Sequence, residues 1–215
     1  IPRTSVVETL EEAMRESSAL GWPLVLKPQS SSRYRDRVAI DAYHVTYAEG
    51  EDALAAQMQR FAGRCPVLLQ EYYSGTGHGV ELLAHRGRPL AAFQHRRLHE
   101  VPVTGGASAL RESVRLDPVL YAHAARLLEA LSWTGLAMVE FKLGREGPKL
   151  MEVNGRVWGS LPLAVHAGMD FPRQLARLHF DGPPDEGTPP DTSYRVGVRA
   201  RNLELDLLWI AAVIG

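Results

Sequence analysis

Three oxygen-bearing side chains gather on one predicted hairpin, which carries the clearest chemistry in this sequence. The hairpin covers residues 136–154, and Glu152 and Asn154 share a face of its second strand because alternate residues of a strand point the same way. A turn centred on residue 146 places Glu140 opposite Glu152, with Cβ atoms about 4.5–5.5 Å apart. Mg²⁺ binds carboxylate and amide oxygens, usually together with substrate phosphates. The hairpin therefore predicts a metal site built from these three residues.

The two carboxylates have an alternative interpretation as solvated charges on an outward face. Like charges that face each other across a ladder repel. The neighbours expected on that face, Met138 and Leu150, are apolar, which weakens the solvated alternative. A bound cation would turn the repulsion between Glu140 and Glu152 into attraction.

A second candidate is Lys27, at the end of the apolar strand 24–26 and shortly before Ser30-Ser31-Ser32. Lysine is a compact point charge for phosphate. A loop of small residues lets backbone N–H groups and hydroxyls approach phosphate oxygens. A lysine at a strand end is also often simply solvated, so this pattern alone indicates phosphate binding weakly.

The elements that must position these residues follow an α+β pattern, which differs from a doubly wound parallel sheet. A first helix opens at Ser5 with Glu8 three positions on, in the capping-box pattern, and ends at Gly21. Asp117 caps another helix that has proline at its first position. The remaining predicted elements are strands 24–26, 38–42, 67–73, 80–85 and 90–98, the loop 29–37, and helices 51–62, 160–167 and 172–179.

Composition excludes several classes of function. The 215 residues include 24 Lys plus Arg and 25 Asp plus Glu, a formal net charge of −1, which argues against an electrostatically driven nucleic-acid binder. Cys65 is the single cysteine, which excludes a disulfide framework and a multi-cysteine metal site and favours the cytoplasm. No apolar run approaches the roughly 20 residues that span a bilayer. The chain opens without Met and stops within the apolar run 205–215, so we expect a piece of a longer protein.

Four segments together resemble the ATP-grasp superfamily, in particular its carboxylate–amine ligases. They are GWPLVLKP, CPVLLQEYYSG, GLAMVEFKL and KLMEVNGR, in family order over nearly the whole chain. The resemblance implies an α+β ATP-grasp fold with a small lid subdomain over residues 1–69. A larger antiparallel-sheet subdomain with flanking helices and the metal site would cover residues 70–201. Residues 202–215 would be the start of a truncated C-terminal helix.

The resemblance also implies roles for individual residues, with Mg-ATP bound between the two subdomains. The residues implied to contact ATP are Lys27, Ser30, Ser31, Ser32, Gln70, Glu71, Tyr72, Tyr73, His78 and Glu81. Lys27 and the serines would hold the phosphates, residues 70–73 the adenine, and His78 or Glu81 the ribose. The implied metal ligands, for Mg²⁺ or alternatively Mn²⁺, are Glu140, Glu152 and Asn154. The residues implied to neutralise the transferred phosphoryl group are Arg156, Arg97 and Arg96.

The serine-rich loop departs from the glycine-rich loops of many relatives, and Arg33, Arg35 and Arg37 would share its phosphate duty. Relatives also carry a further α/β domain before the lid, which commonly contributes to the acceptor pocket and is absent from this sequence. Trp158 lines the acceptor site or belongs to the core, and both interpretations stay open.

The activity implied by the resemblance is that of an ATP-dependent ligase. A carboxylate would be activated as an acyl-phosphate and joined to an amine, with small-molecule acids and amines as partners and neither nucleic acid nor membrane. An oligomer is compatible with the sequence. One alternative is another ATP-grasp reaction, carboxylation or small-molecule phosphorylation. The other is an inactive module that binds nucleotide for regulation.

Overall fold

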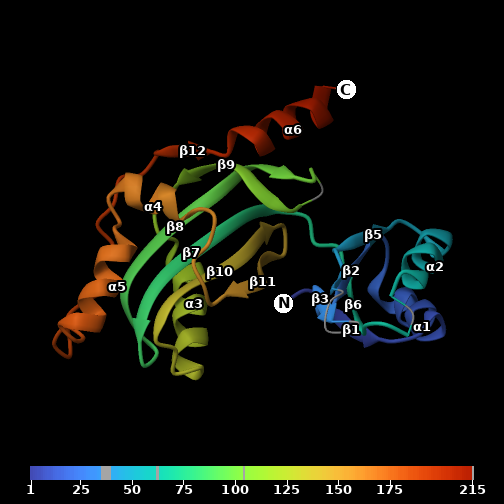
Figure 1. Cartoon of the computed structure of the whole chain (residues 1–215), viewed down its shortest axis with the longest axis horizontal. Helices are drawn as coiled ribbons and strands as arrows, with labels where there is room; N and C mark the ends of the chain where they lie inside the picture. Colours follow the sequence, from blue (N-terminus) through green and yellow to red (C-terminus); the bar gives the residue numbers. More distant parts are fainter. Residues whose placement is uncertain (35–39, 62, 104, 215) are drawn as a thin grey trace. The chain divides into compact units, whose positions relative to one another are not determined.

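The computed structural model describes residues 1–34, 40–61, 63–103 and 105–214, with side chains left out of the description at 33, 34, 40 and 41. The chain divides into two compact units, Ile1–Tyr73 and Ser74–Gly215. The predicted boundary after residue 69 falls inside a strand of unit 1 that continues to Glu71. Each unit has its own sheet and its own core (Figure 1).

Unit 1 is a four-stranded antiparallel sheet covered by two helices. The strand order is β1-β6-β2-β5, and β3 and β4 pair as a separate ribbon. The elements are β1 Thr4–Val7, α1 Leu10–Leu20, β2 Leu24–Pro28, β3 Ser32–Tyr34, β4 Ile40–Ala42, β5 Thr46–Ala48, α2 Glu51–Gln59 and β6 Val67–Glu71.

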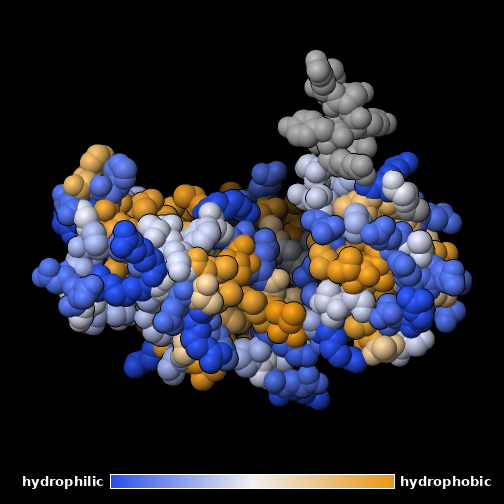
Figure 2. Space-filling view, turned by 90° about the horizontal axis from the view of Figure 1, so that it is seen from below, coloured by the Kyte–Doolittle hydropathy of each residue, from blue (hydrophilic) through white to orange (hydrophobic). Residues whose placement is uncertain are grey.

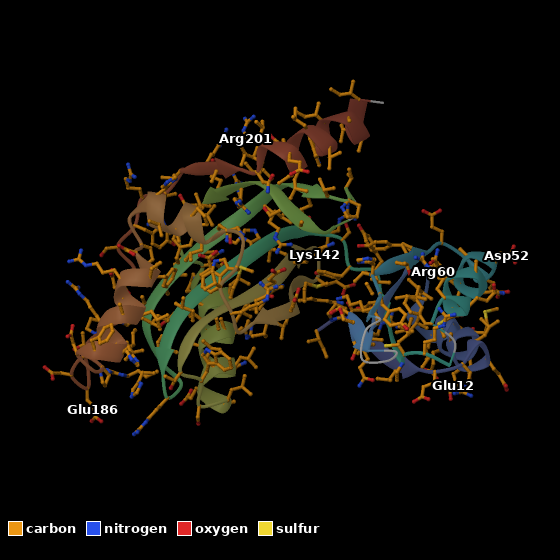
Figure 3. The ribbon with its side chains drawn as sticks, in the orientation of Figure 1. Glu12, Asp52, Arg60, Lys142, Glu186 and Arg201 are labelled. Atoms are coloured by element: carbon orange, nitrogen blue, oxygen red, sulfur yellow. The ribbon has the colours of Figure 1, made fainter. Side chains whose placement is uncertain are left out.

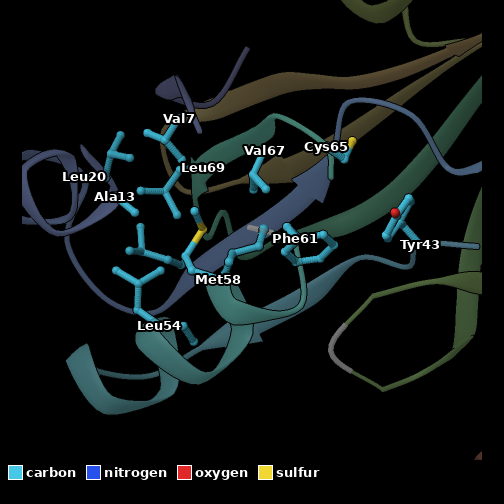
Figure 4. Close-up of a cluster of buried hydrophobic side chains, with 13 residues drawn as sticks. Val7, Ala13, Leu20, Tyr43, Leu54, Met58, Phe61, Cys65, Val67 and Leu69 are labelled. Atoms are coloured by element: carbon cyan, nitrogen blue, oxygen red, sulfur yellow. The ribbon is translucent and has the colours of Figure 1, made fainter. Parts of the chain in front are cut away.

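The core of unit 1 lies between this sheet and its helices (Figure 4). Leu24 and Leu26 of β2 and Leu69 of β6 are fully buried, as the apolar runs of these strands predict. Leu54 and Met58 of α2 pack against them. The predicted apolar face of the second helix is confirmed, although α2 ends at Gln59.

The first helix begins four residues later than the sequence predicts. Thr9 is its N-cap, and Thr9 and Glu12 form a capping box. The sequence contains two candidate boxes of this form, and Ser5 belongs to β1, which pairs antiparallel with β6. Strand pairing with a distant segment therefore decides between two locally equivalent caps. Gly21 ends the helix as predicted, with φ at 78°.

A second difference lies in the predicted loop 29–37. Ser32–Tyr34 forms β3 and pairs with β4. The rest of that loop after Tyr34, and the first two residues of the predicted strand 38–42, lie outside the described residues.

Unit 2 is a six-stranded antiparallel sheet in the order β11-β10-β7-β8-β9-β12. All its connections fit the predicted α+β class. The elements are β7 Thr76–His85, β8 Arg88–Val101, β9 Ala107–Ser113, α3 Pro118–Ala130, β10 Gly135–Gly144, β11 Gly147–Asn154, α4 Leu161–Ala167, α5 Phe171–Phe180, β12 Arg199–Arg201 and α6 Leu203–Ile214. Asp117 caps α3 through its carboxylate, as predicted.

Helices cover both faces of this sheet (Figure 1). On one face, α3 packs through Leu120 and Leu128 against a cluster that includes Val139 of β10. On the other face, α4 and α5 pack against a cluster that includes Phe93 of β8 and Met138 of β10. The two faces therefore bury alternate residues of the same strands.

The surface of both units is mostly hydrophilic with scattered apolar patches on the face drawn in Figure 2. Such patches are ordinary, because apolar atoms contribute about half of a folded protein's surface. Among the described residues, no helix has the length and apolar character to cross a membrane.

We predict that the capping box at Thr9, and not the one suggested at Ser5, stabilises unit 1. Thr9→Ala should lower the free energy of unfolding by about 1 kcal/mol, because a backbone N–H of the first turn loses its acceptor. Glu12→Ala should also destabilise, whereas Glu8→Ala is the matched control, since the box predicted from Ser5 would need Glu8. Urea unfolding followed by circular dichroism measures all three, and a larger loss for Glu8→Ala than for Glu12→Ala would contradict the assignment.

Candidate active site

The hairpin β10–β11 brings Glu140 and Glu152 directly opposite each other, as the sequence predicts. The turn itself is tighter than expected, because Gly144 pairs with Gly147 and the hairpin is therefore centred between residues 145 and 146. Without correction this register would set Glu140 against Met151. A β-bulge between the pairs Phe141–Leu150 and Glu140–Glu152 absorbs Met151 and restores the facing carboxylates.

The bulge also corrects one detail of the sequence analysis. Leu150 pairs with Phe141 and packs on the α3 side of the sheet, so it is not an apolar neighbour of the carboxylates. Met138 does share their face. It pairs with Asn154, whose Nδ2 donates a 3.1 Å hydrogen bond to Glu140 Oε1.

These three residues line a cavity of about 390 Å³ that lies wholly within unit 2. The β-strands supply one wall, the segment after β11 another, and the start of α6 a third. The side chains that line it are those of His95, Arg97, Ala107, Ser108, Arg111, Met138, Glu140, Glu152, Asn154, Arg156, Trp158, Ser160, Asn202 and Leu205.

Arg97 is the cation that faces the carboxylates. Its Nη2 lies 2.5 Å from Glu140 Oε2, and its Nη1 donates to Glu100 Oε1 and to the Gly106 carbonyl. Burial by itself would lower the pKa of Arg97, but the carboxylates of Glu140 and Glu100 outweigh burial and raise it. The glycine at position 77 leaves room for the Arg97 side chain, because an added Cβ there would lie 2.9 Å from Arg97 Cδ.

Lys142 lies further along β10, two residues from Glu140 and therefore on the same face (Figure 3). Burial lowers its pKa, the carboxylate of Glu100 opposes that shift, and the charge of Arg97 adds to it. Two basic groups thus lie close to Glu140 on this part of the sheet.

Arg96, which the sequence analysis grouped with Arg97, points to the other face of the sheet. Successive residues of a strand alternate, and the Arg96 guanidinium makes two hydrogen bonds, of 2.9 and 2.6 Å, to Glu112 Oε2. Glu112 also accepts from Arg199 on β12. Glu112 therefore links Arg96 of β8 to Arg199 of β12, and Arg96 does not line the cavity.

His78 and Glu81, two alternatives for one role in the sequence analysis, also lie on opposite faces. His78 is on the α3 side, where its Nδ1 lies 3.2 Å from Gln94 Nε2. Burial lowers its pKa, His95 and Arg96 lower it further, and Asp117 opposes them. Glu81 is fully buried beneath the cavity.

Glu81 belongs to a buried polar cluster that the sequence analysis missed as a unit. Ser160 Oγ donates a 2.7 Å hydrogen bond to Glu81 Oε1, and His95 Nδ1 lies 2.9 Å from the same oxygen. The sequence holds one signal for this cluster, which is the pair of glycines at positions 77 and 79. Glycines two apart on a strand clear space on a single face.

Arg156 and Trp158 follow β11 and close the cavity. Arg156 is exposed and donates to the carbonyl of Val157 at 3.0 Å. Trp158 is only 3% exposed and meets Phe171 edge-on in the core, yet it also lines the cavity. Trp158 therefore belongs to the core, as one interpretation has it, and its place in an acceptor site stays a prediction.

The remaining predicted site residues lie in unit 1. Lys27 is half-buried at the end of β2 and pairs with Leu68. Ser30 and Ser31 contribute backbone carbonyls, to Cys65 Sγ at 3.8 Å and to the Tyr43 N–H at 2.8 Å. Ser32 opens β3 and is exposed. The side chains of Arg33, Arg35 and Arg37 are outside the described residues.

The segment Gln70 to Tyr73 ends β6 and forms the border of unit 1. Gln70 Nε2 donates to Thr4 Oγ1 at 2.8 Å, and Glu71 accepts from the backbone and side chain of Arg3 at 3.0 and 2.6 Å. The Tyr72 N–H donates to the Pro23 carbonyl at 3.2 Å. Tyr73 is buried.

The sequence and the fold of the chain are similar to those of known proteins. A model of the family described as ATP-grasp in the biosynthetic pathway with Ter operon matches residues 64–202. The chain belongs to this ATP-grasp family. The matched segment includes the whole hairpin and all the residues that line the cavity up to Asn202.

Three relatives illustrate the range of similarity. The ATP-grasp chain is 27% identical to the carbamoyl phosphate synthase large chain of Thermomicrobium roseum over 167 residues, 75% of this chain and 15% of that protein. The biotin carboxylase domain of a 2-oxoglutarate carboxylase from Hydrogenobacter thermophilus, solved with MgADP, ADP and bicarbonate, matches 93% of this chain and 46% of its own, with TM-score 0.63 and 15% identity. D-alanine–D-alanine ligase from Bacillus anthracis, solved with ATP, matches 72% of this chain and 47% of its own, with TM-score 0.50 and 19% identity.

The two structural matches show the fold alone at these identities. The chain spans less than half the length of each of the three proteins. They support the ATP-grasp architecture of both units together with the predicted α+β class.

The oxygen atoms on the ATP-grasp hairpin fit a hard cation. Two carboxylates and one amide face each other, and the Asn154 amide nitrogen is engaged with Glu140, so its amide oxygen is the atom that can bind a cation. Mg²⁺ needs few protein oxygens because it keeps water and phosphate ligands. Within the described part of the chain, no three His, Cys, Asp or Glu side chains form a metal-binding group. The donor set fits Mg²⁺ or Mn²⁺ better than zinc.

The lowered pKa of His78 makes stability depend on pH. The unfolded state binds a proton at the ordinary histidine value of 6.5, while the folded state resists it. Stability contributed by neutral His78 is therefore present above that pH and lost as pH falls toward the folded pKa. Urea unfolding at about pH 7 and about pH 5 should show a smaller loss for His78→Gln than for the unaltered chain, and equal losses would contradict this role.

Proposed function

We propose that this ATP-grasp chain carries out ATP-dependent ligation, activating a carboxylate as an acyl-phosphate and joining it to an amine. The observation that carries the proposal is the cavity of unit 2, where acceptor oxygens and permanent cations lie side by side. Glu140, Glu152 and Asn154 offer oxygens to metal ions, and Arg97 and Arg156 offer positive charge. Phosphoryl transfer requires this combination, because positioning and charge neutralisation supply most of its catalysis.

In the first step, an oxygen of the substrate carboxylate attacks the γ-phosphorus of ATP, and ADP leaves with the electrons of the broken P–O bond. Mg²⁺ held by Glu140, Glu152 and Asn154 would neutralise the phosphate oxygens. Arg97 cannot swing away, because Glu140, Glu100 and a backbone carbonyl hold it, so its charge is already oriented. Preorganised charge of this kind costs no rearrangement during the reaction.

In the second step, the amine nitrogen attacks the acyl carbon, a C–N bond forms, and inorganic phosphate leaves. Arg156, on the exposed rim of the cavity, is the residue we assign to the departing phosphate. In unit 1, Lys27 and Ser30 to Ser32 are the groups we assign to the ATP phosphates, and residues 70–73 to the adenine.

Carboxylation is the second candidate, since one structural match is a biotin carboxylase domain solved with bicarbonate. Bicarbonate is itself a carboxylate-like acceptor for the γ-phosphoryl group, so the first step would be shared. Product analysis separates the two reactions, because a ligase consumes one amine and one acid for each ADP and each phosphate that it releases. Requirement for bicarbonate without an organic acid would favour carboxylation.

The metal assignment predicts that Glu152→Gln loses ATP-dependent phosphate release. Replacing a carboxylate by an amide removes one negative ligand oxygen, and we expect a loss of about 10²-fold or more. Glu146→Gln is the matched control, because Glu146 is on the turn of the same hairpin with its side chain 75% exposed. Phosphate release is measured with MgATP and pooled amino acids and small carboxylates. Normal turnover by Glu152→Gln would remove Glu152 from the metal site.

The nucleotide assignment predicts that Lys27→Ala weakens ATP and ADP binding. A ligand stabilises the folded protein by RT ln(1 + [L]/Kd), so a tenfold weaker affinity lowers that stabilisation by about 1.4 kcal/mol at saturation. Arg60→Ala removes an exposed cation at the end of α2 in the same unit and is the control (Figure 3). The MgADP-induced rise in melting temperature measures both. An unchanged rise in Lys27→Ala would remove Lys27 from the site.

A further inference from the structure

The buried cluster of Glu81, His95 and Ser160 lies at the base of the cavity, and the phosphoryl-transfer step proposed above assigns it no role. Glu81 is 0% exposed, His95 1% and Ser160 4%. The Oε2 atom of Glu81 is buried without a hydrogen-bond partner among the described residues. Burying a carboxylate is costly unless it is paired, so Glu81 depends on its contacts with Ser160 and His95.

Two neighbouring residues, Gly79 and Ser160, position this cluster. Gly79 pairs with His95 in the ladder, and an added Cβ at Gly79 would lie 2.4 Å from His95 Cε1. The imidazole therefore lies flat over a residue without a side chain. Ser160 is the N-cap residue of α4, yet its hydroxyl does not cap that helix and instead donates to Glu81. Gly79 thus leaves room for the imidazole of His95, and Ser160 binds the carboxylate of Glu81.

The geometry distinguishes the two ring nitrogens of His95. Nδ1 lies 2.9 Å from Glu81 Oε1, although it is out of line for a strict hydrogen bond. A carboxylate this close to Nδ1 stabilises the imidazolium, and Nε2 is the nitrogen that we assign to proton exchange with a ligand. His95 lines the cavity, although its side chain is only 1% exposed.

Charged groups surround His95 from every neighbouring strand, and few of them can take a proton. Arg97 and Arg111 remain protonated, and Glu81 raises the pKa of Arg111 against the dominant lowering by burial and a further lowering by Arg97. The other charged or titratable groups around it are His78 on the opposite face, Glu140, Glu152 and Arg156. With Glu140 and Glu152 assigned to the metal, the imidazole of His95 is the remaining nitrogen base among the described side chains that line the cavity.

We propose that His95 is the general base for the amine in the second step, with Glu81 and Ser160 as positioning residues. This inference rests on the proposed ligase function. An amine arrives largely as an ammonium ion and is not nucleophilic until it loses a proton. His95 Nε2 takes that proton, the nitrogen lone pair forms the C–N bond, the C–O bond to phosphate breaks, and phosphate leaves with that electron pair. The proton then returns from His95 to solvent or phosphate.

The test separates carboxylate activation from amine use in the whole protein. The protein is incubated with MgATP and the twenty common amino acids, with and without hydroxylamine. Hydroxylamine is uncharged at neutral pH and traps an acyl-phosphate as a hydroxamate without needing a base. His95→Gln should keep hydroxamate formation while amide formation at pH 7 falls by about 10²-fold. Raising the pH to about 9 increases the free-amine fraction of the amino acids by about tenfold or more and should recover a corresponding part of that loss.

Two further variants guard against a folding defect in His95→Gln. Glu81→Gln keeps the shape of the buried side chain and should reduce amide formation less than His95→Gln does, with hydroxamate formation unchanged. Gly79→Ala should resemble His95→Gln, because the added Cβ turns the imidazole away. His123→Gln, an exposed histidine on α3, is the control that should leave both reactions unchanged.

Each outcome decides a different statement. Absence of hydroxamate in the unaltered protein would overturn the proposed ligase function and this inference with it. Hydroxamate formation in the unaltered protein, with normal amide formation at pH 7 in His95→Gln, would overturn the inference alone. Equal loss of both reactions in a folded His95→Gln variant would also overturn it, because a base for the amine has no part in the first step.

Discussion

The ion pair between Arg97 and Glu140 is the interaction on which the site depends. Glu140 faces Glu152 on the next strand, and two like charges at that spacing destabilise a ladder. The guanidinium of Arg97, 2.5 Å from Glu140, supplies the opposite charge from the other side. Arg97 therefore reduces the repulsion between the two carboxylates in the folded chain.

Arg97 can reach Glu140 only because the strand between them carries no side chain at the crossing. β7 separates β8 from β10, and next to Arg97 and His95 its residues on that face are the glycines at positions 77 and 79. Larger residues there would block the passage of Arg97 and lift His95 off the sheet. The same two glycines thus serve both halves of the proposed reaction, the phosphoryl transfer beside Arg97 and the amine chemistry beside His95.

The sequence predicts the strands of the site well and their finer geometry less well. Strand alternation and a turn predict that Glu140 faces Glu152, and the structure confirms it. This pairing depends on a bulge at Met151, which the pattern of a single strand does not reveal. The assumed turn centre was half a residue too far along, and the bulge compensated for that error. Local periodicity fixes which residues alternate, whereas register between strands is decided by turn geometry and bulges.

Two other differences have the same origin in contacts between distant segments. Thr9, and not Ser5, is the N-cap of the first helix because Ser5 belongs to β1, which pairs with β6 more than sixty residues away. Arg96 and Arg97 were grouped as neighbours in sequence, but adjacent strand residues point to opposite faces, and only one of them can face Glu140. Alternation alone would have separated this pair, so that error was avoidable, while the choice of cap was not.

The last wall of the cavity shows why an apolar pattern alone is an incomplete guide. The run that forms α6 is strongly apolar, but several of its apolar side chains are exposed, and the buried residue is Asp206. His99 Nδ1 lies 2.6 Å from Asp206, and the His99 ring stacks on Trp209 at 3.5 Å. A buried carboxylate is costly when unpaired. The contact between Asp206 and His99 therefore pairs the buried charge and holds α6 against β8. Its start, at Leu205, then forms part of the cavity that the ligase reaction would use.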